Sequence, residues 1–429
     1  MKLSTKLFNL RFKDHYKLLV CGSGAAGNAI VSHFSRCNVD SAIIDPNVEH
    51  HYQPGYTLVA AGLVEAKKLV RKRRDYLPKS VDWFQNSVER FHPKENAVEL
   101  NNGVKLHYDY LVIATGLQLR YDLIEGLPEA FDTPGVCSIY RYDLALKTRS
   151  EVRNFTGGTA LFTYPNTPIK CAGAPQKIAY LADDIFRERK VRDKTVIIYN
   201  TTIGKTFGVE KYRQVLDKII QEKGIILNAR HNLYKVDADK KIAHFEILNE
   251  NGNSTGKRDE IKFDFIHVAP PCSPASALRN LAATGDPLTD GKGWVNVSPK
   301  TLQSQAYPNI FSLGDCISTP CGKTAAAVSS QFNVVKHNLM SVMNGKPLKY
   351  EYDGYASCPL LVDRKHVILA EFNYNGPLET LPIDQAKPRY LQYLMKVYLM
   401  PFIYWHLLLK GRWKGPATIR KLLHLGFGK

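Results

Sequence analysis

The sequence lacks several patterns that would assign a protein class directly. No uninterrupted apolar run reaches the roughly 18 residues that a bilayer-spanning helix needs. Acidic residues are absent from positions 1–13 and from positions 385–429. No CxxC pair occurs, which excludes a zinc ribbon and argues against a small disulfide scaffold. The cysteines instead stand singly, at positions 21, 37, 137, 171, 272, 316, 321 and 358.

What the chain has in excess is positive charge. It carries 58 Lys and Arg against 40 Asp and Glu over 429 residues, a formal net charge of +18, which favours anionic surfaces or substrates. The run EAKKLVRKRR at 65–74 has no aromatic residue for base stacking. We therefore interpret it as a solvated or lipid-facing loop and expect no nucleic-acid partner. The basic, acid-free stretch 1–13 is typical of a short mitochondrial transit peptide, although a frayed overhang fits it equally well.

A glycine-rich turn lies between a predicted strand and a predicted helix near the N-terminus. Residues 15–34 read HYKLLVCGSGAAGNAIVSHF, with Gly22, Gly24 and Gly27 in GxGxxG spacing. Glycine allows the tight turn and close backbone approach that a pyrophosphate at a helix N-terminus requires. A second predicted strand leads to Asp45, whose carboxylate can accept hydrogen bonds from a ribose diol. Together these elements predict a dinucleotide site.

Two later segments indicate which dinucleotide this is. YDYLVIATG at 108–116 ends in Ala-Thr-Gly, and YPNIFSLGDC at 307–316 ends a strand with Gly-Asp. With the first motif they resemble the FAD-binding fingerprints of two-dinucleotide-domain flavoproteins. The resemblance implies that FAD is bound, that Asp315 contacts its ribityl or pyrophosphate portion, and that no metal is needed. The expected FAD contacts are Gly22, Gly24, Ala25, Ala26, Gly27, Asp45, Gln53, Thr115, Gly116, Gly314, Asp315, Lys323 and Thr324.

A second α/β unit follows, but it lacks the glycine-rich turn of a nicotinamide site. The turn between its first strand and helix reads PNTPIKCAG at 165–173, and its prolines remove N–H donors. The next strand ends at Asn200, where a nicotinamide domain would have an acid or an arginine. NAD(P)H is therefore not the expected electron donor.

Cys171 in that turn is a candidate redox thiol. It precedes a predicted helix whose positive N-terminal end, together with Lys170, favours a thiolate. A buried structural cysteine is the alternative interpretation. A two-electron thiol site needs a second sulfur, and the residues alone leave four candidates open: Cys137, Cys316, Cys321 and Cys358.

A closer resemblance covers nearly the whole chain after residue 14. The segments HYQPGYTLVAAG, FTYPNTPIKCAGAPQK, LGDC followed by KTAAAV, YDGYASCPL and YLMPFIYW, in this order, resemble the mitochondrial sulfide:quinone oxidoreductase family. The resemblance implies that hydrosulfide opens a Cys171–Cys358 bridge, that Cys358 carries the sulfane sulfur as a persulfide, and that Cys171 faces the flavin. Electrons would pass through FAD to ubiquinone, and glutathione or sulfite would remove the sulfur. Lys323 is expected as a positive group near the flavin or quinone.

This sequence departs from the family pattern at two cysteines. Cys321 and Cys137 are not expected there, and Cys137 leaves a covalent link to FAD open. Two other functions also remain as alternatives. One is a type II NADH:quinone oxidoreductase, and the other is a non-catalytic FAD-binding protein with a structural or signalling role. The missing second glycine-rich turn and the presence of Cys171 count against the first, and the second would not need two cysteines in matching family motifs.

The C-terminal region combines apolar, aromatic and basic residues. VYLMPFIYWHLLL at 397–409 is too short to span a bilayer, and KGRWKG follows it. This pattern predicts interfacial helices on an anionic membrane, with a helical pair packed on the body or a dimer contact as the alternative. The resemblance implies a peripheral or monotopic protein of the mitochondrial inner membrane, and an oligomer stays possible.

The expected fold class is α/β, with two Rossmann-like dinucleotide-binding domains and a C-terminal membrane-associating helical region. The expected organisation is a possible transit peptide at 1–13, the first part of the FAD domain at 14–125, a second Rossmann-like domain without a nicotinamide loop at 126–264, a return to the FAD domain at 265–345, and a C-terminal region with the second redox cysteine and interfacial helices at 346–429.

Overall fold

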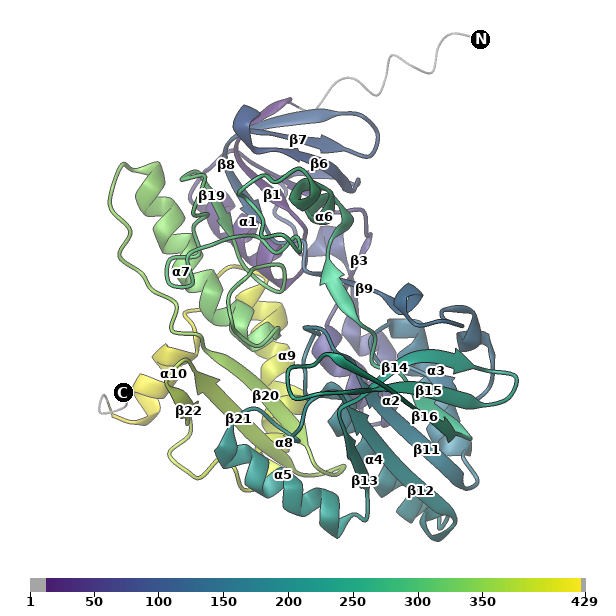
Figure 1. The fold of residues 1–429 in the computed structure, drawn as a ribbon. Coiled ribbons are helices and arrows are strands. Elements are labelled where there is room, and N and C mark those ends of the chain that lie inside the picture. The colour runs from purple at the N-terminus through teal and green to yellow at the C-terminus, as the bar shows by residue number, and fades with distance from the viewer. Residues whose placement is uncertain (1–12, 426–429) are drawn as a thin grey trace, which may run out of the picture.

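The computed structural model describes residues 13–425, so the expected transit segment lies almost wholly outside the described residues. Two α/β units and a C-terminal region are stacked against one another, as Figure 1 shows. The expected α/β class with two Rossmann-like units is confirmed. No helix within residues 13–425 has both the length and the hydropathy needed to cross a membrane.

The first unit is built on a seven-stranded sheet in the order β5-β2-β1-β8-β7-β6, with β19 paired to the second half of β8. Five of its strands are parallel and are flanked by helices, so their side chains are apolar on both faces. The strands are β1 (His15–Cys21), β2 (Ser41–Ile44), β5 (Asp82–Phe84), β6 (Val88–His92), β7 (Ala97–Leu100), β8 (Lys105–Ile113) and β19 (Ile310–Ser312); the helices are α1 (Ala25–Arg36), α6 (Ser276–Ala283) and α7 (Ala325–Met343), and the short elements β3 (Glu49–His51), α2 (Tyr56–Ala60) and β4 (Val70–Lys72) lie between β2 and β5.

The second unit has a five-stranded parallel sheet in the order β10-β17-β11-β12-β13, and an antiparallel sheet β14-β15-β16 follows β13. Because β17 pairs with β11, residues 265–267 belong to this unit and not to the returning FAD unit, which corrects the expected boundary at 264. The elements are β10 (Val136–Cys137), α3 (Tyr142–Asn154), β11 (Gly158–Tyr164), α4 (Ala174–Glu188), β12 (Thr195–Thr201), α5 (Glu210–Glu222), β13 (Ile226–Ala229), β14 (His231–Asp237), β15 (Ile242–Leu248), β16 (Ser254–Lys262) and β17 (Phe265–His267).

Two antiparallel strands connect the units. The chain leaves the first unit along β9 (Leu117–Leu119) and returns along β18 (Cys272–Pro274), and these strands pair with each other. The C-terminal region then adds an antiparallel sheet of β20 (Ala356–Leu361), β21 (Val367–Asn373) and β22 (Gly376–Leu378). This sheet contacts α4 of the second unit and α7 of the first, so the C-terminal region fills the space between them.

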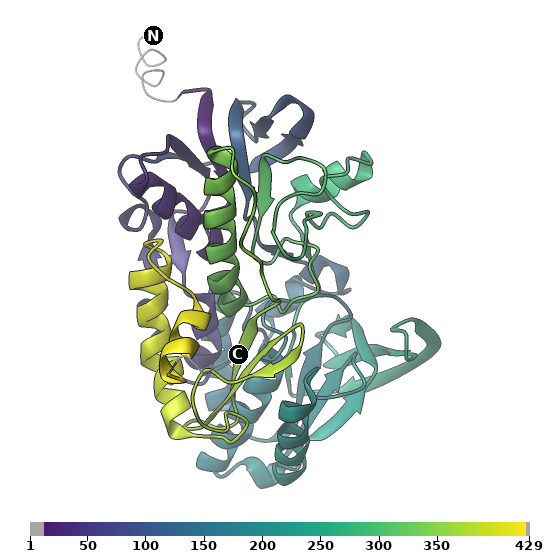
Figure 2. The same cartoon turned by 90° about the vertical axis from the view of Figure 1, so that its left-hand side faces the viewer.

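The chain ends in a long helical run that lies against the first unit. It comprises α8 (Tyr390–Leu394), η8 (Met395–Leu399), α9 (Met400–Phe402) and η9 (Ile403–Leu408), of which η8 and η9 are π-helical, a form that is frequent at functional sites. The Asn28 side chain in α1 donates to the Leu409 carbonyl at 2.9 Å. A separate helix, α10 (Pro416–Leu423), packs on α7. In Figure 2 the yellow C-terminal helices lie along the purple first unit.

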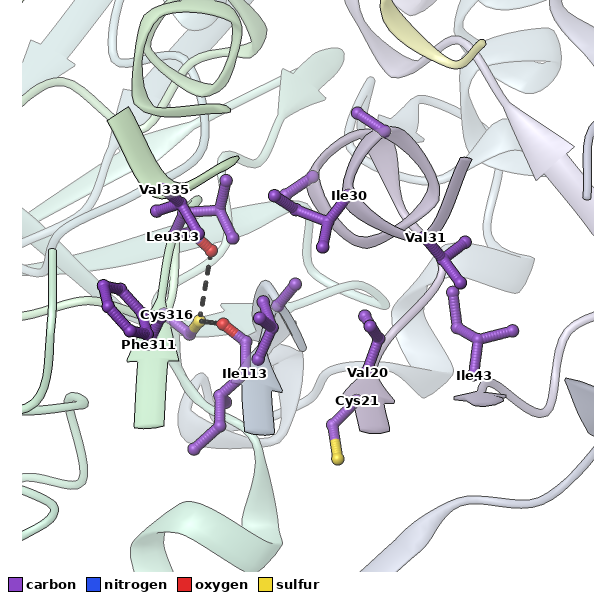
Figure 3. Packing of buried hydrophobic residues seen from close by; sticks show 14 of the residues in the cluster. Val20, Cys21, Ile30, Val31, Ile43, Ile113, Phe311, Leu313, Cys316 and Val335 are labelled. Carbon is purple, nitrogen blue, oxygen red and sulfur yellow. Dashed lines mark hydrogen bonds between the residues drawn. The ribbon is translucent and has the colours of Figure 1, made fainter. Parts of the chain in front are cut away.

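The main core lies between the first sheet and its helices. Figure 3 shows Val20 and Ile113 of the central strands packing against Ile30 of α1 and Val335 of α7. Cys316 is buried in this core, where its Sγ atom contacts the carbonyl oxygens of Leu313 and Ile113 at 3.6 and 3.7 Å. Because it belongs to this cluster of apolar core residues, Cys316 packs here as a small apolar side chain.

A buried ion cluster fixes α4 to the elements after it. The Asp183 carboxylate is fully buried and accepts hydrogen bonds from Arg187 at 3.0 Å, Arg192 at 2.6 Å and Lys223 at 3.0 Å. Burial opposes ionisation, but the hydrogen bond from Arg187 and the charge of Lys223 outweigh it, and the pKa of Asp183 is lowered. The stabilisation is therefore present above the unfolded pKa of about 4 and is lost as pH falls through the folded pKa.

We expect Asp183→Asn to lower the free energy of unfolding by about 3 kcal/mol, because it leaves three cations without their buried counter-ion. Urea unfolding followed by circular dichroism measures this, with the exposed Asp239→Asn as the control. Equal unfolding midpoints for the two variants would contradict the importance of the cluster.

Candidate functional site: a buried cysteine pair

Cys171 and Cys358 lie together although 187 positions separate them in the sequence. Their Sγ atoms are 3.8 Å apart, and both residues are unbridged. Cys171 lies in the turn before α4, as expected. The sequence around Cys358 predicts a loop that precedes the strand RKHVILAEF at 364–372. That prediction is wrong, because Cys358 lies within strand β20; Pro359 obscured the strand pattern. The pairing of β20 with β21 fixes the position of this sulfur.

The N-terminus of α4 points toward the two sulfurs. Gly173 caps this 15-residue helix, and a Cβ atom at Gly173 would lie 2.7 Å from Cys358 Sγ and 2.6 Å from the Leu360 side chain. Glycine is therefore required for the close approach of β20. Cys171 itself has φ of +46°, a strained conformation for a residue with a side chain, and its N–H donates to the Lys323 carbonyl at 2.8 Å.

Two buried lysines flank the pair. Lys177 of α4 is 2% exposed, and its Nζ atom lies 3.2 Å from Cys171 Sγ and 3.9 Å from Cys358 Sγ. Lys396 of η8 is 4% exposed and is close enough for its charge to act on both thiols. Sequence reasoning missed both residues. The available signal was a single charge within each of two otherwise apolar helical stretches, because a lone buried charge needs a partner.

The electrostatics of the site shift the pKa values of the two thiols in opposite directions. A hydrogen bond from Cys358 and the charges of Lys177 and Lys396 hold the pKa of Cys171 well below its usual value. The hydrogen bond to Cys171 and burial raise the pKa of Cys358. Burial alone would lower the pKa of Lys177, but the charge of Cys171 outweighs it and raises that pKa. Burial and the charge of Lys177 lower the pKa of Lys396 to about 7. The site thus favours a thiolate on Cys171 beside an ammonium on Lys177.

The other cysteines do not reach this pair. Cys137 is buried in β10, where burial raises its pKa to about 12, so this thiol is protonated and inert. Cys272 is buried in β18, and burial raises its pKa to about 11. Cys321 accepts one hydrogen bond from Gln331 at 3.4 Å and shares another with Thr319 at 3.2 Å.

The glycine-rich turn of the first unit has the shape of a phosphate cradle. A Cβ atom at Gly22 would lie 2.4 Å from the Ala114 carbonyl, and one at Gly27 would lie 1.8 Å from the Gly22 carbonyl, so both glycines permit close backbone packing. A Cβ atom at Gly24, by contrast, would meet no described atom within 4 Å. That position faces open space at the N-terminus of α1, where the backbone can approach a ligand. Ala25 and Ala26 form the first turn of this helix.

The remaining expected contacts surround this cradle and the start of α7. Asp45 Oδ2 accepts from the Ser23 N–H at 2.7 Å, and Asp45 also pairs with buried Arg73 at 3.3 Å. Arg73 was not foreseen; it neutralises the acid and holds the loop by donating to the Ser23 carbonyl. The Thr115 hydroxyl is buried and has no hydrogen-bond partner within residues 13–425. Gly116 and Gly314 both have positive φ angles.

The other four expected contacts lie near the turn that carries Cys171 or at the start of α7. Gln53 accepts from Lys170 at 3.2 Å. Burial raises the pKa of Asp315 despite the nearby charges of Lys170 and Lys323. Lys323 donates to the Ile317 carbonyl at 2.6 Å and lies over the Trp294 ring. The Thr324 side chain caps α7 by accepting from the Ala327 N–H at 3.1 Å.

This combination of two dinucleotide folds and a cysteine pair defines a class of disulfide oxidoreductases, and comparisons agree. Residues 16–162 match the family described as pyridine nucleotide-disulphide oxidoreductase. The mouse protein named mitochondrial sulfide:quinone oxidoreductase is 45% identical over 420 residues, covering 96% of this chain and 91% of that protein. The Dictyostelium discoideum protein of the same name is 41% identical, covering 95% and 89%. The chain belongs to the mitochondrial sulfide:quinone oxidoreductase family.

A solved structure shares the fold. The X-ray structure of sulfide:quinone oxidoreductase from Aquifex aeolicus has a TM-score of 0.78 and 19% identity, covering 97% of this chain and 96% of that one. Members of these families are FAD-binding flavoproteins. The residues present here fit that cofactor, because Gly24 leaves room for a pyrophosphate and the unpartnered Thr115 hydroxyl can bond a ligand.

We expect Lys177→Met to raise the pKa of Cys171, because it removes the cation nearest to that thiolate. At a pH below the pKa, alkylation then slows by about tenfold for each unit by which the pKa rises, because only the thiolate reacts. The rate of iodoacetamide labelling at Cys171, followed by mass spectrometry across pH, measures this.

Lys170→Met is the matched control, since it removes the lysine next to Cys171 in sequence, which bonds Gln53 instead. A labelling profile that shifts equally in both variants would contradict the specific pairing of Lys177 with Cys171.

Proposed function

We propose that this protein oxidises hydrogen sulfide at the Cys171–Cys358 pair and passes the electrons to ubiquinone. The observation that carries the proposal is the 3.8 Å separation of two sulfurs beside Lys177 and the N-terminus of α4. Such a site favours thiol–disulfide chemistry, because the reactive form of a thiol is the thiolate. Membership of a family whose members are named for this reaction supports the substrate.

The two cysteines have different roles in the proposed cycle. Starting from a Cys171–Cys358 disulfide, hydrosulfide attacks Cys358 Sγ, so that a new sulfur–sulfur bond forms there and the bond to Cys171 breaks. Cys358 then carries a persulfide, and Cys171 leaves as a thiolate that holds the electron pair. Lys177 assists because it stabilises that thiolate, and a leaving thiol of lower pKa departs faster. Glutathione or sulfite then attacks the outer sulfur of the persulfide and frees Cys358 as a thiol.

Re-forming the disulfide requires two electrons to leave the cysteine pair. When bound, FAD supplies the two-electron acceptor that connects this pair to a quinone. The cradle at Gly22, Gly24 and Gly27 would hold its pyrophosphate, Asp45 its ribose, and Asp315 its ribityl portion. Because Cys137 is buried and protonated within the second sheet, we propose that FAD is bound without a covalent link.

A type II NADH:quinone oxidoreductase is disfavoured by one feature of the second unit. In a nicotinamide domain the N-terminus of the helix after the first strand binds a pyrophosphate. Here β20 lies against that end of α4, with Leu360 and Cys358 packed onto Gly173. The positive end of α4 therefore faces the two sulfurs, and the β20–β21 hairpin occupies the position that a second dinucleotide would need.

We expect sulfide, mixed anaerobically with the protein, to bleach the flavin absorbance, and a ubiquinone analogue to restore it. Cys171→Ser should retain FAD but fail to bleach with sulfide, because no thiolate is left to carry the electrons. NADH should leave the flavin oxidised in both proteins. Bleaching by NADH but not by sulfide in the unmodified protein would favour the NADH dehydrogenase alternative.

We propose further that the C-terminal helices dock on a mitochondrial membrane, where a lipid-soluble quinone is available. Large apolar side chains are exposed along them: Tyr398 and Phe402 are 67% and 55% exposed, and Leu422 is 73% exposed. Exposed aromatic and aliphatic groups on a helix with basic flanks are typical of interfacial binding. The relatives named mitochondrial support the location.

We expect Leu399→Asn with Phe402→Asn to weaken partitioning onto phosphatidylcholine vesicles by about 1,000-fold, since each of the two apolar side chains contributes about 2 kcal/mol when buried. Sedimentation with vesicles measures this. The matched control, Val104→Asn with Leu123→Asn, changes two exposed apolar residues of other surfaces and should partition normally. Equal losses in both double variants would contradict docking through these helices.

A further inference from the structure

A basic segment of the first unit lies directly beside the C-terminal helical run. The Arg71 guanidinium lies 5.2 Å from the centre of the Trp405 ring. The Lys410 Nζ atom lies 4.6 Å from the centre of the Tyr76 ring and donates to the Asp75 carbonyl at 3.2 Å. These contacts join stretches 335 positions apart into one surface. We name this surface the basic rim: Lys67, Lys68, Arg71, Lys72, Lys410 and Arg412.

The rim is fixed to the body by neutral groups, so its positive charge is largely uncompensated. Lys410 is held by a carbonyl and an aromatic ring, and Arg71 donates to the Val70 carbonyl at 2.8 Å. Burial, and then the neighbouring charge of Arg412, lower the pKa of Lys410. Only Lys67 pairs with a carboxylate in the described chain, that of Glu65 at 3.2 Å, and both partners are largely exposed. An exposed pair of this kind screens little charge.

The rim also borders the exposed apolar face of the helical run. Trp405, which Arg71 covers, follows Phe402 by one helical turn, and Phe402 is more than half exposed. Apolar side chains therefore project from the same helix whose end carries Lys410. Basic groups next to exposed apolar groups match the layered structure of a membrane surface, with acyl chains beneath phosphates.

We infer that the basic rim binds the phosphate groups of anionic phospholipids and so gives the protein a preference for anionic membranes. The inference rests on the proposed docking of the C-terminal helices and adds a second, electrostatic contact from a different part of the chain. Nucleic acid is disfavoured as the occupant, because residues 65–74 offer no aromatic side chain for base stacking, and Arg71 and Lys410 already cover the Trp405 and Tyr76 rings beside the rim. Two contacts of different kinds are what stable peripheral binding requires.

The test replaces three exposed rim lysines together: Lys67→Gln, Lys68→Gln and Lys72→Gln. The matched control replaces three exposed lysines of the β14–β16 sheet, Lys240→Gln, Lys257→Gln and Lys262→Gln, so the net charge changes equally. Figures 1 and 2 both place that teal sheet on the side away from the yellow C-terminal helices. Each holoprotein is sedimented with vesicles of phosphatidylcholine alone and with vesicles containing about a third phosphatidylglycerol.

We expect the rim variant to lose about 100-fold in partitioning onto the anionic vesicles, since each basic residue near such a surface contributes about fivefold. Its partitioning onto neutral vesicles should equal that of the unmodified protein, and the control variant should behave as the unmodified protein on both. High salt should remove the difference, because exposed charges are screened.

Two results separate failure of the rim from failure of the docking proposal. If the unmodified protein binds neutral and anionic vesicles equally, or if the rim variant keeps its anionic preference, the rim does not bind lipid phosphate while apolar docking stands. If the unmodified protein binds neither kind of vesicle, docking and rim are both overturned. A rim that served an acidic protein instead would leave vesicle partitioning unchanged in the variant, which also overturns the inference.

Discussion

The structure depends on keeping a sulfur anion stable where water is largely excluded. A buried charge is costly unless it is paired and hydrogen-bonded. Here the Cys171 sulfur receives a hydrogen bond from Cys358, lies 3.2 Å from the Lys177 ammonium, and faces the positive end of α4. Cys358 is placed by the pairing of β20 with β21, and Lys177 lies one helical turn inside α4. The positive end of α4 comes from the alignment of the helix backbone. The packing of β20 on Gly173 brings all three to one point.

The second unit shows how one helix terminus can serve two chemistries. The N-terminus of a helix after a parallel strand is suited to any anion, because its N–H groups are unpaired and its dipole is positive there. A nicotinamide domain uses that property for a pyrophosphate. In this chain the C-terminal hairpin covers the same helix end, and the anion is a thiolate. The two uses exclude each other sterically, since a Cβ atom alone does not fit between Gly173 and Cys358.

Local patterns predicted much of this architecture. The glycine spacing predicted a tight turn between a strand and a helix, and that turn is present, because the conformational needs of Gly22 and Gly27 are set by neighbouring backbone. The helix after Cys171 was predicted for the same reason, since its apolar period is local. What sequence reasoning could not supply were contacts between distant segments: Lys396 beside the thiols, Arg73 on Asp45, and the strand that carries Cys358. Such contacts depend on tertiary packing, and the strand was also obscured by Pro359.

The two buried lysines have a consequence for the energetics of oxidation. While Cys171 is a thiolate, its negative charge offsets the repulsion between Lys177 and Lys396. In the proposed cycle, forming the disulfide removes that charge and leaves the two lysines in a buried space without their counter-ion, which favours proton release from Lys396, whose pKa is already lowered to about 7. Electron loss at sulfur and proton loss at nitrogen are thereby linked, and the midpoint potential of the pair becomes a function of pH through groups that are not themselves oxidised. In that cycle the two lysines balance the charge that the sulfur loses.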